Sequence, residues 1–285
     1  MTKGRLIKGY AGFYYAACDG EIITCKARGL FRKRNEKPVI GDFVLVDMDE
    51  QTGEGTITEI LPRKNELARP SVSNIDCMVV TIAFEPSPDT LLADKMLVQA
   101  LYAGITPMIC VNKSDVGVHD EIVDAYKKTG FALFVVSAHT GNGIDELLQA
   151  IAGLCVCFAG QSGVGKSSVI NRVTCDARME TGDLSEKSGR GRHTTRHVEL
   201  LPVNGGYVVD TPGFSLIEAQ ALPENIDRYY PEMEPYIGDC RFQGCEHKTE
   251  PDCAIKERAQ SGEISELRYR QYLKLLEERK SVRAY

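Results

Sequence analysis

Residues 160 to 167 form the stretch of this sequence with the clearest chemistry. They read Gly160-Gln161-Ser162-Gly163-Val164-Gly165-Lys166-Ser167, which fits the pattern G-x-x-x-x-G-K-[ST]. In this pattern, glycines let backbone N–H groups turn inward around phosphates, the lysine reaches the β- and γ-phosphate oxygens, and the last hydroxyl ligates Mg²⁺. A strand is predicted over 154–159 and a helix from Ser168 onward, so we interpret 160–168 as a phosphate-binding loop. The alternative, a chance glycine-rich turn, does not explain the lysine and the hydroxyl.

A second motif, Asn112-Lys113-Ser114-Asp115, follows a predicted strand over 108–111 and indicates which base is bound. An ionised carboxylate only accepts hydrogen bonds, so Asp115 can accept from both N1–H and the 2-amino group of guanine. Adenine lacks the 2-amino group and would leave a buried carboxylate unpaired. The tripeptide Ser137-Ala138-His139 follows the next predicted strand, over 133–136, and we predict that the Ala138 N–H donates to guanine O6. Each motif is weak alone and becomes informative beside a phosphate-binding loop.

A third motif, Asp210-Thr211-Pro212-Gly213, ends a predicted strand over 207–209 and fits the acidic element of a GTP-hydrolysing site. Asp210 is predicted to hold Mg²⁺ through water, and the Gly213 N–H to sense the γ-phosphate. The polar stretch 175–197 is too long for an ordinary connection, so we expect a mobile switch that the γ-phosphate orders. Within it, Thr194 and Thr195 are candidates for a hydroxyl ligand to Mg²⁺, and we favour Thr195.

One expected catalytic residue is missing. Ras-type enzymes place a water-orienting glutamine directly after the Asp-x-x-Gly motif, where this sequence has Phe214. Phenylalanine cannot orient water, so we expect slow intrinsic hydrolysis and activation by a partner. His193, in the stretch Gly189-Arg190-Gly191-Arg192-His193-Thr194-Thr195, is the nearest candidate to replace it. Either His193 positions the attacking water or it only supports the switch, and the sequence favours neither role.

Four residues near the C-terminus have the spacing of a metal site, C-x4-C-x-H-x5-C: Cys240, Cys245, His247 and Cys253. Three thiolates and an imidazole suit tetrahedral Zn²⁺, and a closed four-ligand shell indicates a structural role, with one zinc per chain. Reduced surface cysteines are the alternative. Other cysteines sit inside apolar runs, where a thiol behaves as a small hydrophobe, and no disulfide framework is expected. These are Cys77, Cys110, Cys155 and Cys157.

The elements that must position these residues fall into three segments. Residues 1–68 contain short β-rich stretches, over 5–15, 21–27, 42–47 and 55–60, which predicts a β-barrel of the OB-fold type. Residues 69–218 alternate strand and helix signals, which predicts an α/β domain with a parallel sheet. Residues 219–285 hold the Cys/His motif and a helical stripe over 263–280, which predicts a mainly α, zinc-binding domain. We expect that stripe to pack on its own domain rather than on a partner.

The order of the motifs is unusual. The base motifs at 112–115 and 137–139 precede the phosphate loop, whereas Ras-type proteins have the phosphate loop first. Chain ends at a surface can be relocated without altering the core, so we interpret the central segment as a circularly permuted GTPase domain. In this order the 210–213 motif leads directly into the C-terminal segment. We hypothesise that a γ-phosphate-dependent shift at Gly213 passes into that segment.

Composition limits the class of protein. With 285 residues and a formal net charge of −6, the chain is not a uniformly basic nucleic-acid binder. Two basic clusters, within 26–37 and 187–196, are either solvated faces or RNA-binding surfaces. Basic residues of the C-terminal stripe, Arg268 among them, are offset by nearby glutamates and carry no functional prediction. No apolar run approaches the roughly 18 residues of a membrane span, and no signal-type core follows the N-terminus, so we expect a cytoplasmic protein that meets no membrane. We also expect it to be a monomer.

Taken in order, the motifs N-K-S-D, S-A-H, G-Q-S-G-V-G-K-S, G-R-G-R-H-T-T, D-T-P-G and C-x4-C-x-H-x5-C resemble those of one bacterial family. It is the family of small ribosomal subunit biogenesis GTPases called RsgA, YjeQ or YloQ, and the resemblance covers nearly the whole chain. It implies an N-terminal OB-fold, a permuted GTPase domain and a C-terminal zinc domain. It also implies GTP hydrolysis to GDP and phosphate, stimulated by the small ribosomal subunit, late in that subunit's maturation, with its rRNA as a partner.

By motif match, the resemblance assigns base recognition to Asn112, Lys113 and Asp115, phosphate binding to 160–168, and zinc to the four Cys/His residues. Two other functions stay open. One is a GTPase that acts on a non-ribosomal RNA or protein. The other is a nucleotide-gated RNA-binding module in which hydrolysis is incidental.

Overall fold

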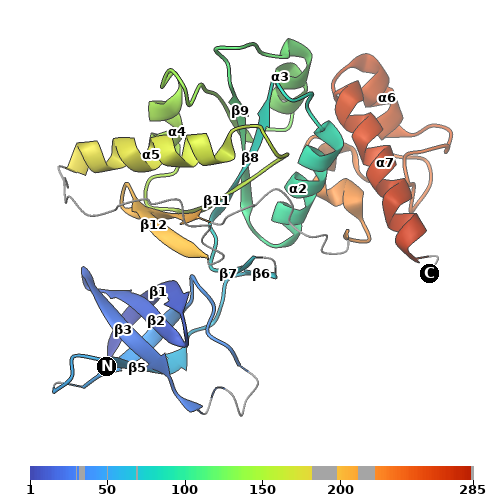
Figure 1. Ribbon diagram of the computed structural model, residues 1–285. Coiled ribbons are helices and arrows are strands. Elements are labelled where there is room, and N and C mark those ends of the chain that lie inside the picture. The colour runs from blue at the N-terminus through green and yellow to red at the C-terminus, as the bar shows by residue number, and fades with distance from the viewer. Residues whose placement is uncertain are drawn as a thin grey trace. The chain divides into compact units, whose positions relative to one another are not determined.

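A computed structural model describes residues 1–29, 31, 36–49, 51–68, 70–181, 198–210 and 222–283 (Figure 1). The chain divides into two compact units. The described residues of 1–77, 148–157 and 173–214 form the first unit, and those of 78–147, 158–172 and 215–285 form the second.

Five strands close into a barrel in the first unit: β1 (Thr2–Tyr10), β2 (Phe13–Cys18), β3 (Glu21–Ala27), β4 (Phe43–Met48) and β5 (Gly55–Ile60). The antiparallel pairs are β1–β2, β2–β3, β4–β5 and β1–β4, and the parallel pair β3–β5 completes the ring (Figure 1). Apolar side chains fill the interior, among them Leu6, Val44 and Ile57. The predicted barrel of the OB type is confirmed.

One predicted β stretch, over 5–15, is two strands in the structure. The chain reverses at Ala11 and Gly12, whose φ angles are +51° and +86°. Positive φ at both central residues is typical of a type I′ turn, whose twist matches that of the flanking strands. Tyr10 and Phe13 flank the turn and pair with each other. Because both are aromatic residues that favour strands, the pattern concealed the turn.

The first unit also contains the start of β11 (Cys155–Ala159), up to Cys157, together with β12 (Glu199–Val203) and β13 (Gly206–Asp210). β13 pairs parallel with β11 and antiparallel with β12. β12 in turn pairs with β1 of the barrel at Lys8 and Glu199, whose side chains form an ion pair of 3.2 Å. The sequence reasoning missed β12, because Pro202 interrupts a very short run. A small hairpin, β6 (Glu66–Ala68) and β7 (Ser71–Ser73), follows the barrel.

Strands and helices alternate in the second part of the chain, as predicted. The elements are β8 (Cys77–Ala83), α2 (Thr90–Tyr102), β9 (Thr106–Asn112), α3 (Asp120–Lys127), β10 (Ala132–Val135) and α4 (Ile144–Ala150). β9 lies between β8 and β10, and its pairing with β10 is parallel. After β11, α5 (Lys166–Thr181) begins directly at the phosphate loop. It ends at Thr181, so residues 175–181 of the predicted switch, 175–197, are helical and not a loop. Residues 182–197 lie outside the described part.

The C-terminal region contains two short 3-10 helices, η1 (Ile226–Tyr229) and η2 (Glu234–Tyr236), and two α-helices, α6 (Ala254–Ser261) and α7 (Glu266–Arg283). No strand occurs within 222–283. The apolar stripe of α7, including Tyr272 and Leu276, packs against Ile226 and Ile264 of its own region, which agrees in part with the prediction. The same cluster includes Val98 of α2, and α7 runs beside α2 in Figure 1.

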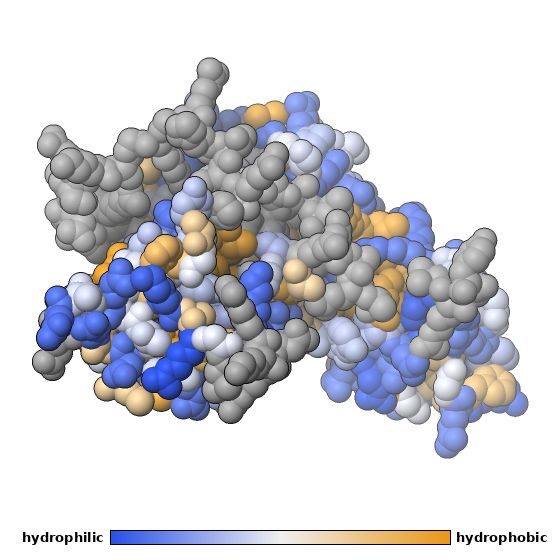
Figure 2. Space-filling model, turned by 60° about the horizontal axis from the view of Figure 1, so that its bottom comes forward, coloured by the Kyte–Doolittle hydropathy of each residue, from blue (hydrophilic) through white to orange (hydrophobic). Residues whose placement is uncertain are grey.

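On the face that Figure 2 shows, most of the coloured residues are hydrophilic, with smaller hydrophobic patches between them. Among the helices of the described residues, none combines the length and apolar character that crossing a membrane requires. The four cysteines of the apolar runs are buried free thiols, as expected. Burial raises the pKa of Cys110 to about 12 and that of Cys155 to about 11, so both are protonated at neutral pH.

Candidate nucleotide site and metal centre

The phosphate loop follows β11 and requires glycine at two positions. Gly160 and Gly165 have φ angles of +146° and +90°, which L side chains rarely adopt. A Cβ on Gly160 would lie 2.2 Å from the Thr81 carbonyl oxygen, and one on Gly165 would lie 2.4 Å from Asn112 Nδ2. Both glycines therefore permit a close approach of the loop to its neighbours.

Lys166 stands at the start of α5, and its side chain folds back over the loop. Its Nζ donates to the carbonyl oxygens of Gly160 at 2.7 Å and Gln161 at 2.9 Å. Partial burial lowers the pKa of Lys166. A lysine at a helix N-terminus suits phosphate binding, because its charge and the helix N-terminus both attract an anion.

Asn112 joins the three motifs that the sequence placed apart. Its Nδ2 donates to the Val164 carbonyl at 2.9 Å, and its Oδ1 accepts from the Ala138 N–H at 3.1 Å. The side chain is buried, and its bond to Val164 is shielded from water. The base motif, the 137–139 motif and the phosphate loop therefore form one site.

Asp115 and Ser137 form the polar end of this site. Ser137 Oγ donates to Asp115 Oδ1 at 2.5 Å, and this hydrogen bond lowers the pKa of the carboxyl. The Ser114 N–H donates to the Val136 carbonyl at 3.1 Å, which fixes the motif to the end of β10. Asp115 is thus ionised and held in one orientation, as base recognition requires. The Ala138 amide already donates to Asn112, so its contact with guanine O6 stays a prediction.

A cavity of about 500 Å³ opens between these motifs. Its volume is in the range of small-ligand pockets. It is lined by Asn112, Lys113, Asp115, Val116, Ala138, His139, Gly165 and Ser168.

Sequence reasoning missed the segment between β8 and α2, which borders the loop. The Glu85 carbonyl accepts from Lys113 Nζ at 2.8 Å, and Pro86 lies 3.5 Å from where a Cβ on Gly163 would be. Lys113 has φ +63°, in the left-handed region that residues other than glycine rarely adopt. This segment could have been predicted from its place after β8, because the C-terminal ends of parallel strands meet at one edge of the sheet.

The residues predicted for Mg²⁺ and for hydrolysis are only partly described. Ser167 lies exposed in the first turn of α5, where a hydroxyl suits a hard cation. Asp210 ends β13, as predicted. His193, Thr194, Thr195, Gly213 and Phe214, and with them the basic cluster within 187–196, lie outside the described residues.

The four predicted zinc ligands converge. Their ligand atoms all lie within 4.8 Å of one another. His247 Nδ1 is 3.4 Å from Cys240 Sγ and 3.4 Å from Cys253 Sγ, and the two sulfurs are 3.8 Å apart. A tetrahedral zinc ion with usual bond lengths separates two sulfurs by about 3.8 Å and sulfur from nitrogen by about 3.5 Å. The donor set and its spacing therefore fit Zn²⁺.

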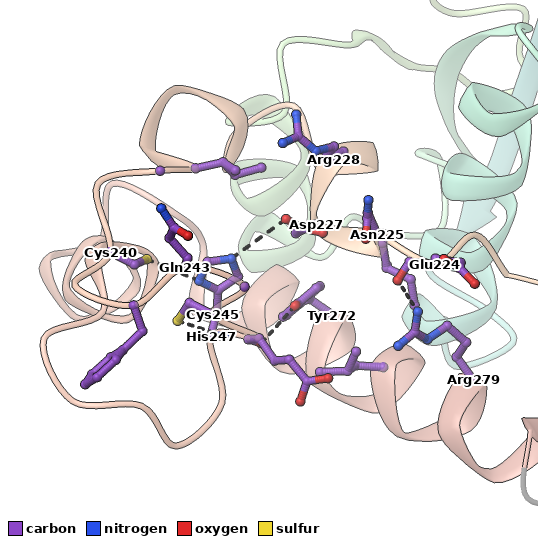
Figure 3. Close-up of a pocket in the computed structure, with 17 residues that line it drawn as sticks. Glu224, Asn225, Asp227, Arg228, Cys240, Gln243, Cys245, His247, Tyr272 and Arg279 are labelled. Atoms are coloured by element: carbon purple, nitrogen blue, oxygen red, sulfur yellow. Dashed lines mark hydrogen bonds and ion pairs between the residues drawn. The ribbon is translucent and has the colours of Figure 1, made fainter.

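Neighbouring residues hold this cluster in place (Figure 3). His247 Nε2 faces Asp227, 3.9 Å from its Oδ2, the arrangement in which a carboxylate orients a metal-binding imidazole. Two tyrosines of α7 hold the loop backbone: Tyr269 donates to the His247 carbonyl at 2.6 Å and Tyr272 to that of Glu246 at 2.9 Å. The loop of residues 240–253, which we call the zinc loop, is therefore held directly against α7.

Comparison with known proteins agrees with this geometry. Family models described as "RsgA GTPase" and "RsgA N-terminal domain" match residues 60–220 and 3–57. The small ribosomal subunit biogenesis GTPase RsgA of Caldanaerobacter subterraneus subsp. tengcongensis is 46% identical over 97% of this chain and 95% of its own length. That of Agathobacter rectalis is 43% identical over 99% of both chains.

Solved structures show the same arrangement. The crystal structure of YloQ, described as a circularly permuted GTPase, is 32% identical with a TM-score of 0.81, and covers 99% of this chain and 96% of YloQ. YjeQ from Thermotoga maritima is 33% identical with a TM-score of 0.81, over 98% of both chains. The chain therefore belongs to the RsgA family of circularly permuted GTPases.

Proposed function

We propose that this protein hydrolyses GTP to GDP and phosphate as a late maturation factor of the small ribosomal subunit, which stimulates the reaction. GTP binding and hydrolysis are supported above all by the two hydrogen bonds of the Asn112 amide, which join the base motif to the phosphate loop and to the 137–139 motif. Full-length similarity to proteins named for small-subunit biogenesis supports the partner. We further propose segments of 1–68, 69–218 and 219–285 for the barrel, the GTPase domain and the zinc domain.

The proposed roles follow the chemistry of each residue. Asp115 accepts from guanine, Asn112 and Lys113 support that site, and residues 160–168 surround the phosphates. Mg²⁺ supplies charge neutralisation at the phosphates when bound, and Ser167, Thr195 and Asp210 are the residues that would hold it. The Gly213 N–H is proposed to sense the γ-phosphate.

Stimulation by a partner is proposed because Phe214 stands where a water-orienting glutamine is expected. His193 is the residue we propose to position water or to support the switch. If replacing His193 with Ala leaves subunit-stimulated turnover unchanged, the water-positioning role is wrong.

The decisive experiment is the rate of GTP hydrolysis with and without purified small ribosomal subunits. We expect strong stimulation, and its loss in Lys166→Ala, which removes the cation of the phosphate loop. Stimulation by another RNA alone would favour a non-ribosomal target instead. Nucleotide-dependent RNA affinity with negligible turnover under all conditions would favour a nucleotide-gated RNA-binding module.

The Cys240, Cys245, His247 and Cys253 cluster is proposed to hold one structural zinc per chain. Elemental analysis that finds no zinc in purified protein would contradict this. We place the protein in the cytoplasm because its proposed partner matures there, and we propose that it acts as a monomer, which sedimentation would test.

A further inference from the structure

α7 is fixed to α2 by a charged cluster that excludes water. Arg268 of α7 and Asp94 of α2 are fully buried and form an ion pair of 2.5 Å between Nη1 and Oδ1. Arg268 Nε also donates to Glu232 Oε1 at 2.7 Å. The Tyr230 ring lies 4.4 Å from the guanidinium carbon, so the cation also rests on an aromatic face. Charges buried this completely must stay paired, so α7 and α2 cannot slide independently.

α7 also holds the first turn of α2. Gln271 Nε2, on the turn of α7 after Arg268, donates to Thr90 Oγ1 at 2.8 Å. Tyr126 of α3 donates its hydroxyl to Asp94 Oδ1 at 2.7 Å. The N-terminal end of α2 is therefore held by two neighbouring helices.

The same end of α2 contacts the phosphate loop. Asp89 caps the helix, since its Oδ1 accepts from the Leu92 N–H at 2.9 Å. The backbone N–H of Asp89 donates to Gln161 Oε1 at 3.1 Å. The carbonyl of Gln161 accepts from Lys166 Nζ at 2.9 Å. One loop residue thus contacts the phosphate-binding lysine with its backbone and α2 with its side chain.

We propose that Gln161 and the first turn of α2 couple phosphate binding at Lys166 to the position of α7, with Arg268 and Gln271 as positioning residues. The coupling rests on the proposed nucleotide site. It is separate from the tether between 210–213 and the C-terminal region, because it requires contact with the phosphate loop and no γ-phosphate. Coupling free energies are reciprocal. If bound nucleotide reduces the opening of α7 by a given factor, then a variant in which α7 is no longer coupled should bind nucleotide more weakly by the same factor.

The test is hydrogen–deuterium exchange in α7 of the intact, zinc-loaded protein, with and without GDP. We expect GDP to slow exchange roughly two- to tenfold, the range that one net hydrogen bond supports. Gln271→Ala should abolish most of this GDP-dependent difference and weaken GDP binding by a similar factor. Lys274→Ala, on the exposed side of α7, is the matched control and should keep both.

Gln271→Ala changes α7 itself, so two substitutions at the start of α2 test the coupling without changing the sequence of α7. Thr90→Val removes the acceptor of Gln271 and should also uncouple the helix. Asp89→Ala removes the cap and should reduce the GDP effect, whereas Asp89→Asn keeps a capping oxygen and should restore it.

The outcomes separate the two proposals. If calorimetry shows GDP binding while exchange in α7 is unchanged, the coupling is wrong and the nucleotide site stands. An effect on α7 that needs a GTP analogue and is absent with GDP would assign the coupling to the 210–213 tether instead. Failure of GDP to bind at all would contradict the proposed function itself.

Discussion

Arg268→Met tests the buried cluster that fixes α7. The substitution keeps an unbranched apolar stem of similar length and removes the guanidinium. It leaves Asp94 and Glu232, whose side chains are 0% and 3% exposed, without their cation. The structure holds α7 to α2 through this cation, so we expect local loss of α7 before the barrel is affected.

The expected cost follows from the burial. Removing one partner of a buried ion pair costs about 3–5 kcal/mol, because the remaining charge is uncompensated. That corresponds to roughly a hundredfold to several thousandfold more opening of α7. Arg268→Lys should fall between wild type and Arg268→Met, since an ammonium cannot present the same planar fork to two carboxylates.

The cost should depend on pH. Burial raises the pKa of Asp94, and the positive charge of Arg268 opposes that rise. Without Arg268 the folded pKa rises further above the unfolded value of about 3.9. A carboxyl with a raised folded pKa is most favourable when protonated, below the unfolded pKa, and loses that contribution as pH rises through the folded pKa. The difference between Arg268→Met and wild type should therefore be small near pH 4 and largest near pH 7.

The assay is amide exchange across α7 in the zinc-loaded protein, at several pH values after correction for intrinsic rates. Lys274→Met, at an exposed position of the same helix, is the matched control. A change of less than about 0.5 kcal/mol at pH 7, the usual limit for a surface substitution, would refute the reasoning. So would a cost that does not vary between pH 4 and 7.

Three further predictions concern the metal and nucleotide sites. Cys253→Ser should lower bound zinc below one per chain in elemental analysis and speed amide exchange in the loop of residues 240–253, because three ligands no longer close the shell. Cys175→Ser, at an exposed cysteine, is the control and should change neither. Ser137→Ala removes the hydrogen bond that lowers the pKa of Asp115. Since the ionised carboxylate is the acceptor for guanine, acidification should abolish GDP binding at a higher pH in this variant than in wild type. Identical pH profiles in a fluorescent-GDP titration would contradict this role. Gly165→Ala combines a strained φ with a Cβ at 2.4 Å from an amide nitrogen, so GDP affinity should fall at least about tenfold in calorimetry, and retained affinity would mean that the loop adapts.

Much of the fold and the candidate site could be predicted because the signals are local. The alternation of apolar runs and helical stripes located the strands and helices around 77–159 within a few residues. The errors have physical causes. The turn at Ala11 and Gly12 was missed because it lies between aromatic residues that favour strands. β12 was missed because Pro202, which is rare inside strands, interrupts its short apolar run. Pairing with the neighbouring strand β13, and at one position with β1, stabilises that segment against its weak local preference.

The sequence by itself predicted the chemistry of the loop around Lys166 and of the Cys/His motif, because the spacing of a few neighbouring residues already places their functional groups. Only the tertiary structure decided which distant residues act together. Asn112 contacts the phosphate loop, and Arg268, a basic residue offset by glutamates in the sequence, is buried against Asp94. Burial and pairing depend on what packs around a side chain, and charge patterns along one segment do not contain that information.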